Sequence, residues 1–280
     1  MSESGRLVAS ALVAPDATIA EDLDVCDALG GLLYGLSRLK LDRSLAMSAA
    51  LRRRLAGRVG YFHHSRLFTL GEESRWTRQR DALRRSVELA HDLATNVILA
   101  TSGPAAPEMT WEQAADALAE AVAPVLIEAR AAGVRICVEQ TNVLRQDISF
   151  VTSLADLAAM AAHTGLSVCA DMFWSWRERD LDGALRRCMP HLGLIQIADS
   201  AAGTMSMPDR LVPGDGVVPF RALLGGMLKA GYQGDWDLEV LGPRITAEGA
   251  TSVLHRSVQH VAAILDELRE AHDVLEPATS

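Results

Sequence analysis

The chain has 280 residues, of which 27 are Lys or Arg and 36 are Asp or Glu, so its formal net charge is −9. This acidic balance argues against surfaces that bind nucleic acids or anionic membranes, because both need clustered positive charge. Hydrophobic residues make up 49% of the chain and charged residues 22%, as in ordinary globular proteins. We therefore expect neither a nucleic-acid partner nor a membrane partner.

The four cysteines lie far apart and form no Cys-x-x-Cys pair. This spacing fits buried thiols in a reducing compartment better than a disulfide framework or a zinc knuckle. Near the N-terminus a short apolar stretch follows Glu3 and precedes further acidic residues, whereas a secretory signal usually starts with basic ones. We interpret this stretch as a strand and predict a cytoplasmic protein.

Short β-rich runs alternate with long amphipathic stretches along the chain. Several of the runs are almost entirely apolar, as expected of parallel strands that are covered on both faces. The predicted strands are Arg6–Ala14, Leu32–Leu39, Arg58–His63, Asn96–Thr101, Arg135–Gln140, Leu166–Phe173, Leu192–Ala198 and Asp235–Val240. The predicted helices are Ile19–Leu29, Arg43–Ala56, Glu73–Leu93, Trp111–Ala132, Leu154–His163, Leu181–Cys188, Pro219–Ala230 and Ala247–Leu275.

Residues that start or stop helices support these boundaries. Thr110, with Gln113 three residues later, is typical of a capping box at the start of a helix. Glycine follows several predicted helices, where a left-handed C-terminal residue is common. Pro124 lies inside the stretch Trp111–Ala132, so we expect a kink or a break in that helix.

The repeated strand–helix pattern predicts a parallel α/β fold. Eight units in 280 residues match a (β/α)8 barrel, at about 30 residues per unit. The alternative is a doubly wound open sheet, which usually carries GxGxxG or GxxxxGK[ST] after its first strand; neither motif is present. We predict a single TIM-barrel domain, with the barrel over residues 6–270 and a flexible tail over 271–280.

Oxygen-bearing side chains stand at or near the ends of four consecutive predicted strands. Glu139, Asp171, Gln196 and Glu239 occupy these positions, and Asp199 follows the third of them. In a barrel such ends meet at one rim, where carboxylates would repel one another without a counter-charge. A divalent cation would remove that repulsion, and an all-oxygen donor set favours hard ions. Each acid could instead form its own salt bridge or cap the next helix.

These residues make the chain resemble the xylose-isomerase-like barrels of sugar isomerases and epimerases. Members carry Glu, Asp, His and Glu as metal ligands at the ends of strands 5 to 8, and the matching positions here are Glu139, Asp171, Gln196 and Glu239. The segment PDRLVPGDGVVPF resembles the hydroxypyruvate-isomerase branch, in which glutamine takes the third ligand place. The resemblance implies one divalent metal ion, with manganese favoured and magnesium, cobalt or zinc as alternatives.

Further candidates for substrate binding are Arg210, Trp174, His63, Arg145 and Asp199. Arg210 precedes the Pro-Gly-x-Gly turn and could hold a substrate oxygen through its guanidinium fork, or it could pair with a neighbouring aspartate, 209 or 215. His63 ends a strand and could act as a base or orient a substrate oxygen. Its neighbour at position 64 should point the opposite way, so at most one of the two faces the site.

Two of these residues depart from the standard ketose epimerases that the chain resembles. Trp174 stands where many members place a histidine, and Arg145 stands where some carry a second glutamate. Trp174 and Trp176 could stack on a substrate ring or could pack structurally. If Trp174 faces the site, the substrate is larger or more apolar than a free triose.

The resemblance implies an isomerase or epimerase acting on a keto-sugar or polyol. The metal would hold the substrate's carbonyl, while Glu139 and Glu239 exchange a proton through an enediolate. One alternative is a lyase or dehydratase that uses the same ligands on an oxidised sugar or glycoside, and another is a non-catalytic sugar-binding barrel. The related DNA-repair endonucleases need a histidine-rich metal site and a basic groove, which this chain lacks. A homo-oligomer is the expectation for the family.

Overall fold

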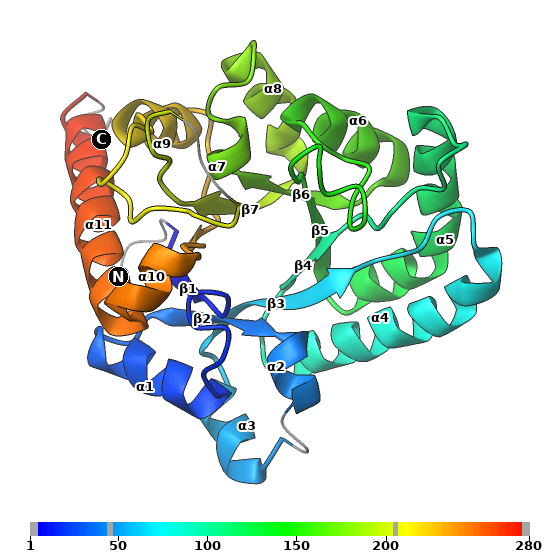
Figure 1. Cartoon of the computed structure of the whole chain (residues 1–280), viewed down its shortest axis with the longest axis horizontal. Coiled ribbons are helices and arrows are strands. Elements are labelled where there is room, and N and C mark those ends of the chain that lie inside the picture. The colour runs from blue at the N-terminus through cyan, green and yellow to red at the C-terminus, as the bar shows by residue number, and fades with distance from the viewer. Residues whose placement is uncertain (1–4, 44–46, 204–206, 276–280) are drawn as a thin grey trace, which may run out of the picture.

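The computed structural model describes residues 5–43, 47–203 and 207–275. Within these residues, eight parallel strands pair in chain order, and β8 also pairs with β1, which closes a barrel. In Figure 1 the strands form an inner ring and the helices lie around it. The predicted (β/α)8 barrel is confirmed, and the open sheet is excluded because both edge strands of that alternative are paired.

The bounds of the elements follow the alternation of the sequence. The strands are β1 Leu7–Ser10, β2 Leu33–Ser37, β3 Val59–Arg66, β4 Val97–Thr101, β5 Arg135–Glu139, β6 Ser167–Asp171, β7 Leu192–Ile197 and β8 Asp235–Leu238. The α-helices are α1 Ile19–Ala28, α2 Arg38–Arg43, α3 Ala49–Leu55, α4 Trp76–Asp92, α5 Trp111–Ala131, α6 Leu154–Thr164, α7 Met172–Ser175, α8 Leu181–Cys188, α9 Phe220–Lys229, α10 Pro243–Glu248 and α11 Ala250–Leu275. Two short 3-10 helices, Glu73–Arg75 and Met189–His191, precede α4 and β7.

Every predicted strand is present, most of them a few residues shorter than expected, whereas several helix boundaries differ. The stretch predicted as Arg43–Ala56 contains the end of α2 and all of α3, and its residues 44–46 lie outside the described residues. Gly249 has a φ of 94°, a conformation that favours glycine, and it separates α10 from α11. α11 continues to Leu275, into the segment predicted as a tail from residue 271; residues 276–280 lie outside the described residues.

Pro124 does not break α5, which runs from Trp111 to Ala131, so of the kink or break that the sequence suggested, the break is wrong. A proline inside a helix leaves the carbonyl four residues earlier without its N–H partner. Here Arg80 of α4 donates from Nη2 to the carbonyl of Glu120 at 3.1 Å and from Nε to the carbonyl of Ala121 at 2.7 Å. The neighbouring helix therefore satisfies the carbonyl that the proline leaves free.

Apolar side chains fill the barrel and the space between strands and helices. The inner cluster is Val8, Leu33, Tyr61, Val97, Leu99, Cys137, Cys169 and Leu194. All four cysteines are buried and free, as the sequence predicts. None of the helices in the described ranges combines the length and apolar composition needed to cross a bilayer. The packed interior therefore leaves the strand ends and their loops to form a site.

Candidate active site

The four predicted ligand residues meet at the carboxyl end of the barrel. Glu139 and Asp171 are the last residues of β5 and β6, Gln196 lies near the end of β7, and Glu239 follows β8 directly. Parallel register places Asp171 beside Gln196. Because the strands are neighbours in the barrel, their end residues share one rim, as the sequence predicted.

Arg210 links two of these carboxylates. Its Nη2 donates to Asp171 Oδ2 at 2.7 Å, and its Nη1 lies 2.8 Å from Glu239 Oε2. The guanidinium also lies over the ring of Phe173, 4.7 Å from its centroid. The alternative pairing of Arg210 with a neighbouring aspartate is wrong: Asp209 lies near Arg244, and Asp215 pairs with Arg256. We call Glu139, Asp171, Gln196, Glu239 and Arg210 the polar cluster.

The carboxyl groups of the polar cluster bind protons more tightly than ordinary ones. Burial raises the pKa of Glu239 to about 7, although Arg210 opposes that shift. Burial also raises the pKa of Asp171. For Glu139, burial and the negative charges of Glu239 and Asp171 together raise the pKa well above its usual range. One guanidinium is therefore too little positive charge to keep all three groups ionised.

A fourth carboxyl group, Asp237, lies beneath the polar cluster and was missed by the sequence analysis. Its Oδ2 accepts hydrogen bonds from Tyr61 Oη at 2.9 Å and from Gln196 Nε2 at 3.2 Å, and the residue is fully buried. Alternate residues of a strand share a face, so Asp237 points the same way as Glu239. That period of two in the segment WDLEV is the signal that could have identified it.

A cavity of about 500 Å³ opens above the polar cluster. The predicted site residues that line it are Glu139, Glu239, Arg210, His63, Trp174 and Arg145. The two adjacent histidines point to opposite sides of β3, as expected. His63 lines the cavity, while His64 is buried with Nδ1 2.7 Å from Ser86 Oγ. Trp174 lines the cavity as well, whereas Trp176 packs against the core and under Arg177.

Asp199 and Arg145 hold loops in place rather than presenting free groups. The Asp199 carboxylate accepts hydrogen bonds from the backbone N–H groups of residues 200, 214, 216 and 218, and the residue does not line the cavity. The substrate contact expected of Asp199 is thus replaced by a role in shaping the loop after β7. Arg145 lines the cavity, but its fork is occupied by Asp147, at 2.8 and 3.0 Å.

The polar cluster has the donor chemistry for a hard divalent cation. As the side chains stand, no group of three or more His, Cys, Asp or Glu in the described part of the chain is arranged to hold a metal, and Arg210 lies between Asp171 and Glu239. Within the same residues, however, the buried Asp237 Oδ1 has no hydrogen-bond partner. Oxygen atoms with unmet charge suit a cation that would take the place of the guanidinium.

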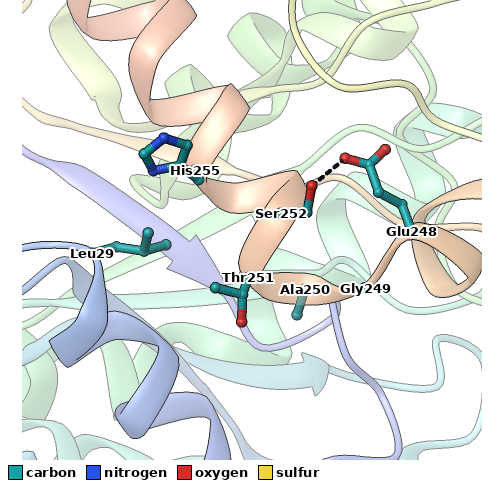
Figure 2. Close-up of a pocket in the computed structure, with 7 residues that line it drawn as sticks. All are labelled: Leu29, Glu248, Gly249, Ala250, Thr251, Ser252 and His255. Atoms are coloured by element: carbon teal, nitrogen blue, oxygen red, sulfur yellow. Dashed lines mark hydrogen bonds between the residues drawn. The ribbon is translucent and has the colours of Figure 1, made fainter.

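A second depression, of about 550 Å³, lies where α11 begins beside the end of α1 (Figure 2). Its ionisable side chains are Glu248 and His255. Ser252 Oγ donates to Glu248 at 2.8 Å, as Figure 2 shows, and Arg256 pairs with the same carboxylate. Its only carboxylate is already paired, so this depression lacks the group of carboxylates found at the barrel mouth, which remains the candidate active site.

Comparisons with known proteins agree with the architecture. The protein SMc04130 of Sinorhizobium meliloti 1021 superposes with a TM-score of 0.82 at 20% identity, covering 94% of this chain and 99% of that one. The IolI protein, crystallised with a zinc atom, gives 0.80 at 13% identity, with coverage of 94% and 99%. The D-psicose 3-epimerase of Clostridium cellulolyticum H10, solved with D-tagatose, gives 0.71 at 17% identity, with coverage of 95% and 98%.

Identities this low establish the fold alone. The comparison with curated protein sequences found no match. The family model for the xylose isomerase-like TIM barrel, in contrast, matches residues 36–269. This match covers most of the chain, from β2 to the last turns of α11. The chain therefore belongs to the xylose isomerase-like TIM barrel family.

Proposed function

We propose that this protein is a divalent-metal-dependent isomerase or epimerase of a keto-sugar or polyol. The observation that carries the proposal is that two carboxyl groups from non-adjacent strands, Glu139 and Glu239, face one cavity beside the cationic Arg210. The zinc atom in IolI and the keto-sugar in the D-psicose 3-epimerase support a metal and a carbohydrate for a site of this fold.

Four side chains would hold the metal: Glu139, Asp171, Gln196 and Glu239. Manganese is the first candidate, with magnesium, cobalt and zinc as alternatives, because an oxygen-only donor set accepts several divalent ions. When bound, the metal would supply Lewis-acid polarisation of the substrate carbonyl. The guanidinium of Arg210 would then leave its place between Asp171 and Glu239 and be available to a substrate oxygen.

The proton transfer falls to the two glutamates. One of them takes the proton from the carbon next to the carbonyl; the C–H electron pair becomes the carbon–carbon double bond of an enediolate, and the π pair of the carbonyl moves onto its oxygen. The other returns a proton to complete the isomerisation or epimerisation. Both glutamates line the cavity, so each can reach a substrate placed there, and a positioned carboxyl group is a common general acid or base. Burial lowers the pKa of His63 to about 4, so a neutral imidazole would orient a substrate hydroxyl.

Exchange of substrate hydrogen with deuterated solvent tests this function. Manganese-loaded protein should incorporate deuterium next to the carbonyl of keto-sugars, followed by mass spectrometry or NMR. Glu239→Gln should lower the exchange rate at least a hundredfold, because an amide cannot accept the proton. Glu88→Gln, on the exposed face of α4, is the matched control and should exchange like the wild type.

The same measurement separates the alternatives. Products of unchanged mass indicate isomerisation or epimerisation, whereas loss of water or of an aglycone indicates a lyase. Undiminished exchange in the Glu239→Gln variant would rule out the assigned role of this residue. Protein that carries no divalent metal in elemental analysis and catalyses no exchange would favour a non-catalytic barrel.

A further inference from the structure

We propose that the substrate of this site carries an apolar aryl or alkyl substituent beside its hydroxyketone part. This inference rests on the proposed function, since it places the hydroxyketone at the polar cluster. What it adds is the chemistry of the rest of the ligand, and it is argued from the upper part of the cavity.

The cavity changes character with height. Its lower part presents Glu139, Glu239, Arg210 and His63. The segments that follow six of the strands add apolar side chains to the lining, which also includes the polar Thr141, Asn142 and Arg66. We call these apolar residues the apolar wall: Leu12, Leu39, Ile148, Trp174, Met207 and Leu241. A ligand that reaches both levels needs a polar end for the strand ends and an apolar end for the wall.

Two large side chains of the apolar wall are exposed to solvent and do not pack into the core of the barrel. Leu39 is 55% exposed and Met207 is 42% exposed. Large apolar side chains scattered singly over a surface need no explanation, but these two line one cavity together with the four other residues of the apolar wall, which marks a binding region.

The size of the cavity points the same way. Pockets of roughly 300–1000 Å³ enclose ligands of drug size, and this one measures about 500 Å³. A free triose would occupy only the part next to the polar cluster and would leave the apolar wall in contact with water. Trp174 stands at the boundary, with its ring centroid 5.5 Å from the Arg210 guanidinium, where it would contact both ends of a longer ligand.

A phosphate in place of the apolar group fits less well. Two arginines, Arg66 and Arg145, line the cavity on the side of the loop after β5. The fork of Arg145 is bidentate on the Asp147 carboxylate, and Arg66 Nη1 donates to the Asp147 carbonyl at 3.1 Å. The fork of Arg145 is therefore closed to an anion, and Arg66, with Nη1 already bonded to the loop, is the one arginine of this pair with donors left to meet a phosphate.

Three derivatives of dihydroxyacetone test the inference: the 1-O-benzyl ether, the 1-O-methyl ether and the 1-phosphate. All share the hydroxyketone and differ only in the substituent. Isothermal titration of the manganese-loaded protein should show the benzyl ether binding about tenfold tighter than the methyl ether, with the phosphate no tighter than the methyl ether. Leu39→Ser should reduce the benzyl advantage severalfold. Ile127→Ser, which replaces an apolar residue 69% exposed on α5, should leave that advantage unchanged.

Deuterium exchange on the same three compounds keeps the two proposals separate. Equal binding of the benzyl and methyl ethers, or tightest binding of the phosphate, overturns the apolar substituent even if all three compounds exchange hydrogen. The proposed apolar substituent is also overturned if Leu39→Ser and Ile127→Ser change the preference for the benzyl ether by the same factor. A benzyl preference that follows Leu39 without any exchange supports the binding inference and contradicts the proposed reaction.

Discussion

Gln196 shows how much of the candidate site depends on contacts below the strand ends. Its Nε2 donates to Asp237, which Tyr61 holds from the other side, and its Oε1 accepts from Cys169 Sγ at 3.4 Å. The sequence could place Gln196 near a strand end, because the apolar run around it predicts where that strand lies in the chain. It could not show which partners orient the amide, since those come from strands on either side and from β3.

His64 links protein stability to pH. Burial, helped by the positive charge of Arg38, lowers the pKa of this histidine to about 3, from about 6.5 in the unfolded chain. Between these values the unfolded state binds the proton more tightly, so stability is complete above pH 6.5 and falls as the pH falls. At pH 5 the loss is about 2 kcal/mol relative to pH 7.

The variant His64→Gln should remove this dependence. Glutamine does not titrate and can still bond to Ser86, so urea unfolding at pH 7 and pH 5 should show a stability loss about 2 kcal/mol smaller than in the wild type. His255→Gln, which alters an exposed histidine, is the control and should behave like the wild type. Equal losses in wild type and His64→Gln would show that His64 takes up no extra proton on unfolding.

The contact between α4 and α5 explains why a proline is tolerated in the middle of a helix. Arg80 spans the two helices and satisfies carbonyls in the turn before Pro124. Removing the guanidinium takes away its hydrogen bonds to the carbonyls of Glu120 and Ala121, each worth about 0.5–1.5 kcal/mol. Arg80→Met should therefore destabilise the protein by roughly 2 kcal/mol in urea unfolding.

A double-mutant cycle with Pro124→Ala isolates this effect. Alanine restores an N–H that can bond to the carbonyl of Glu120, so Arg80→Met should cost at least 1 kcal/mol less in that background. Arg80 also lies over the ring of Trp76, at 5.7 Å, and that contact is lost in both backgrounds. Additive effects would mean that the arginine stabilises the helix pair through Trp76 and not through the proline's carbonyl.

At the scale of elements, apolar runs and helix caps predicted the barrel but not its shortest pieces. The predicted capping box at Thr110 is present, with Gln113 N donating to Thr110 Oγ1 at 3.2 Å. The single turn α7 was not predicted, because one turn has no period to detect. It forms because the Asp171 carboxylate accepts the N–H of Phe173 at 3.0 Å. A residue predicted as a ligand thus also begins a helix.

At the scale of the whole molecule, the sequence predicted which carboxylates share a rim but not the cation that joins them. The alternation of strands is local, so the order of strand ends follows from it. Arg210 reaches Asp171 and Glu239 from the loop after β7, and the path of that loop depends on contacts such as those of Asp199. Contacts between distant loops leave no periodic pattern in the sequence. For Arg210, the sequence therefore left open two roles: binding a substrate oxygen, or pairing with a neighbouring aspartate.

Joining these carboxylates by a divalent ion should stabilise the entire fold. With Arg210 as their counter-charge, the buried acids of the polar cluster keep raised pKa values. At neutral pH the metal-free protein therefore either holds extra protons at these acids or has carboxylates that repel one another. A divalent ion would replace the protons and remove the repulsion. A ligand at one hundred times its Kd stabilises the folded state by about 2.7 kcal/mol. For a chain of this size we expect manganese to raise the Tm by about 5 °C and excess EDTA to reverse the change.

Combining Glu139→Gln with Asp171→Asn tests whether these two side chains bind the manganese ion. Each removes one proposed ligand oxygen charge, and together they should abolish the manganese-dependent rise in Tm. The matched control is Glu248→Gln with Asp215→Asn, two exposed acids that pair with Arg256, and it should keep the full rise. If the wild type and the Glu139→Gln, Asp171→Asn variant gain the same Tm, manganese binds elsewhere. If neither gains any, Arg210 is the permanent counter-charge of this barrel, and the reaction must be sought without a metal.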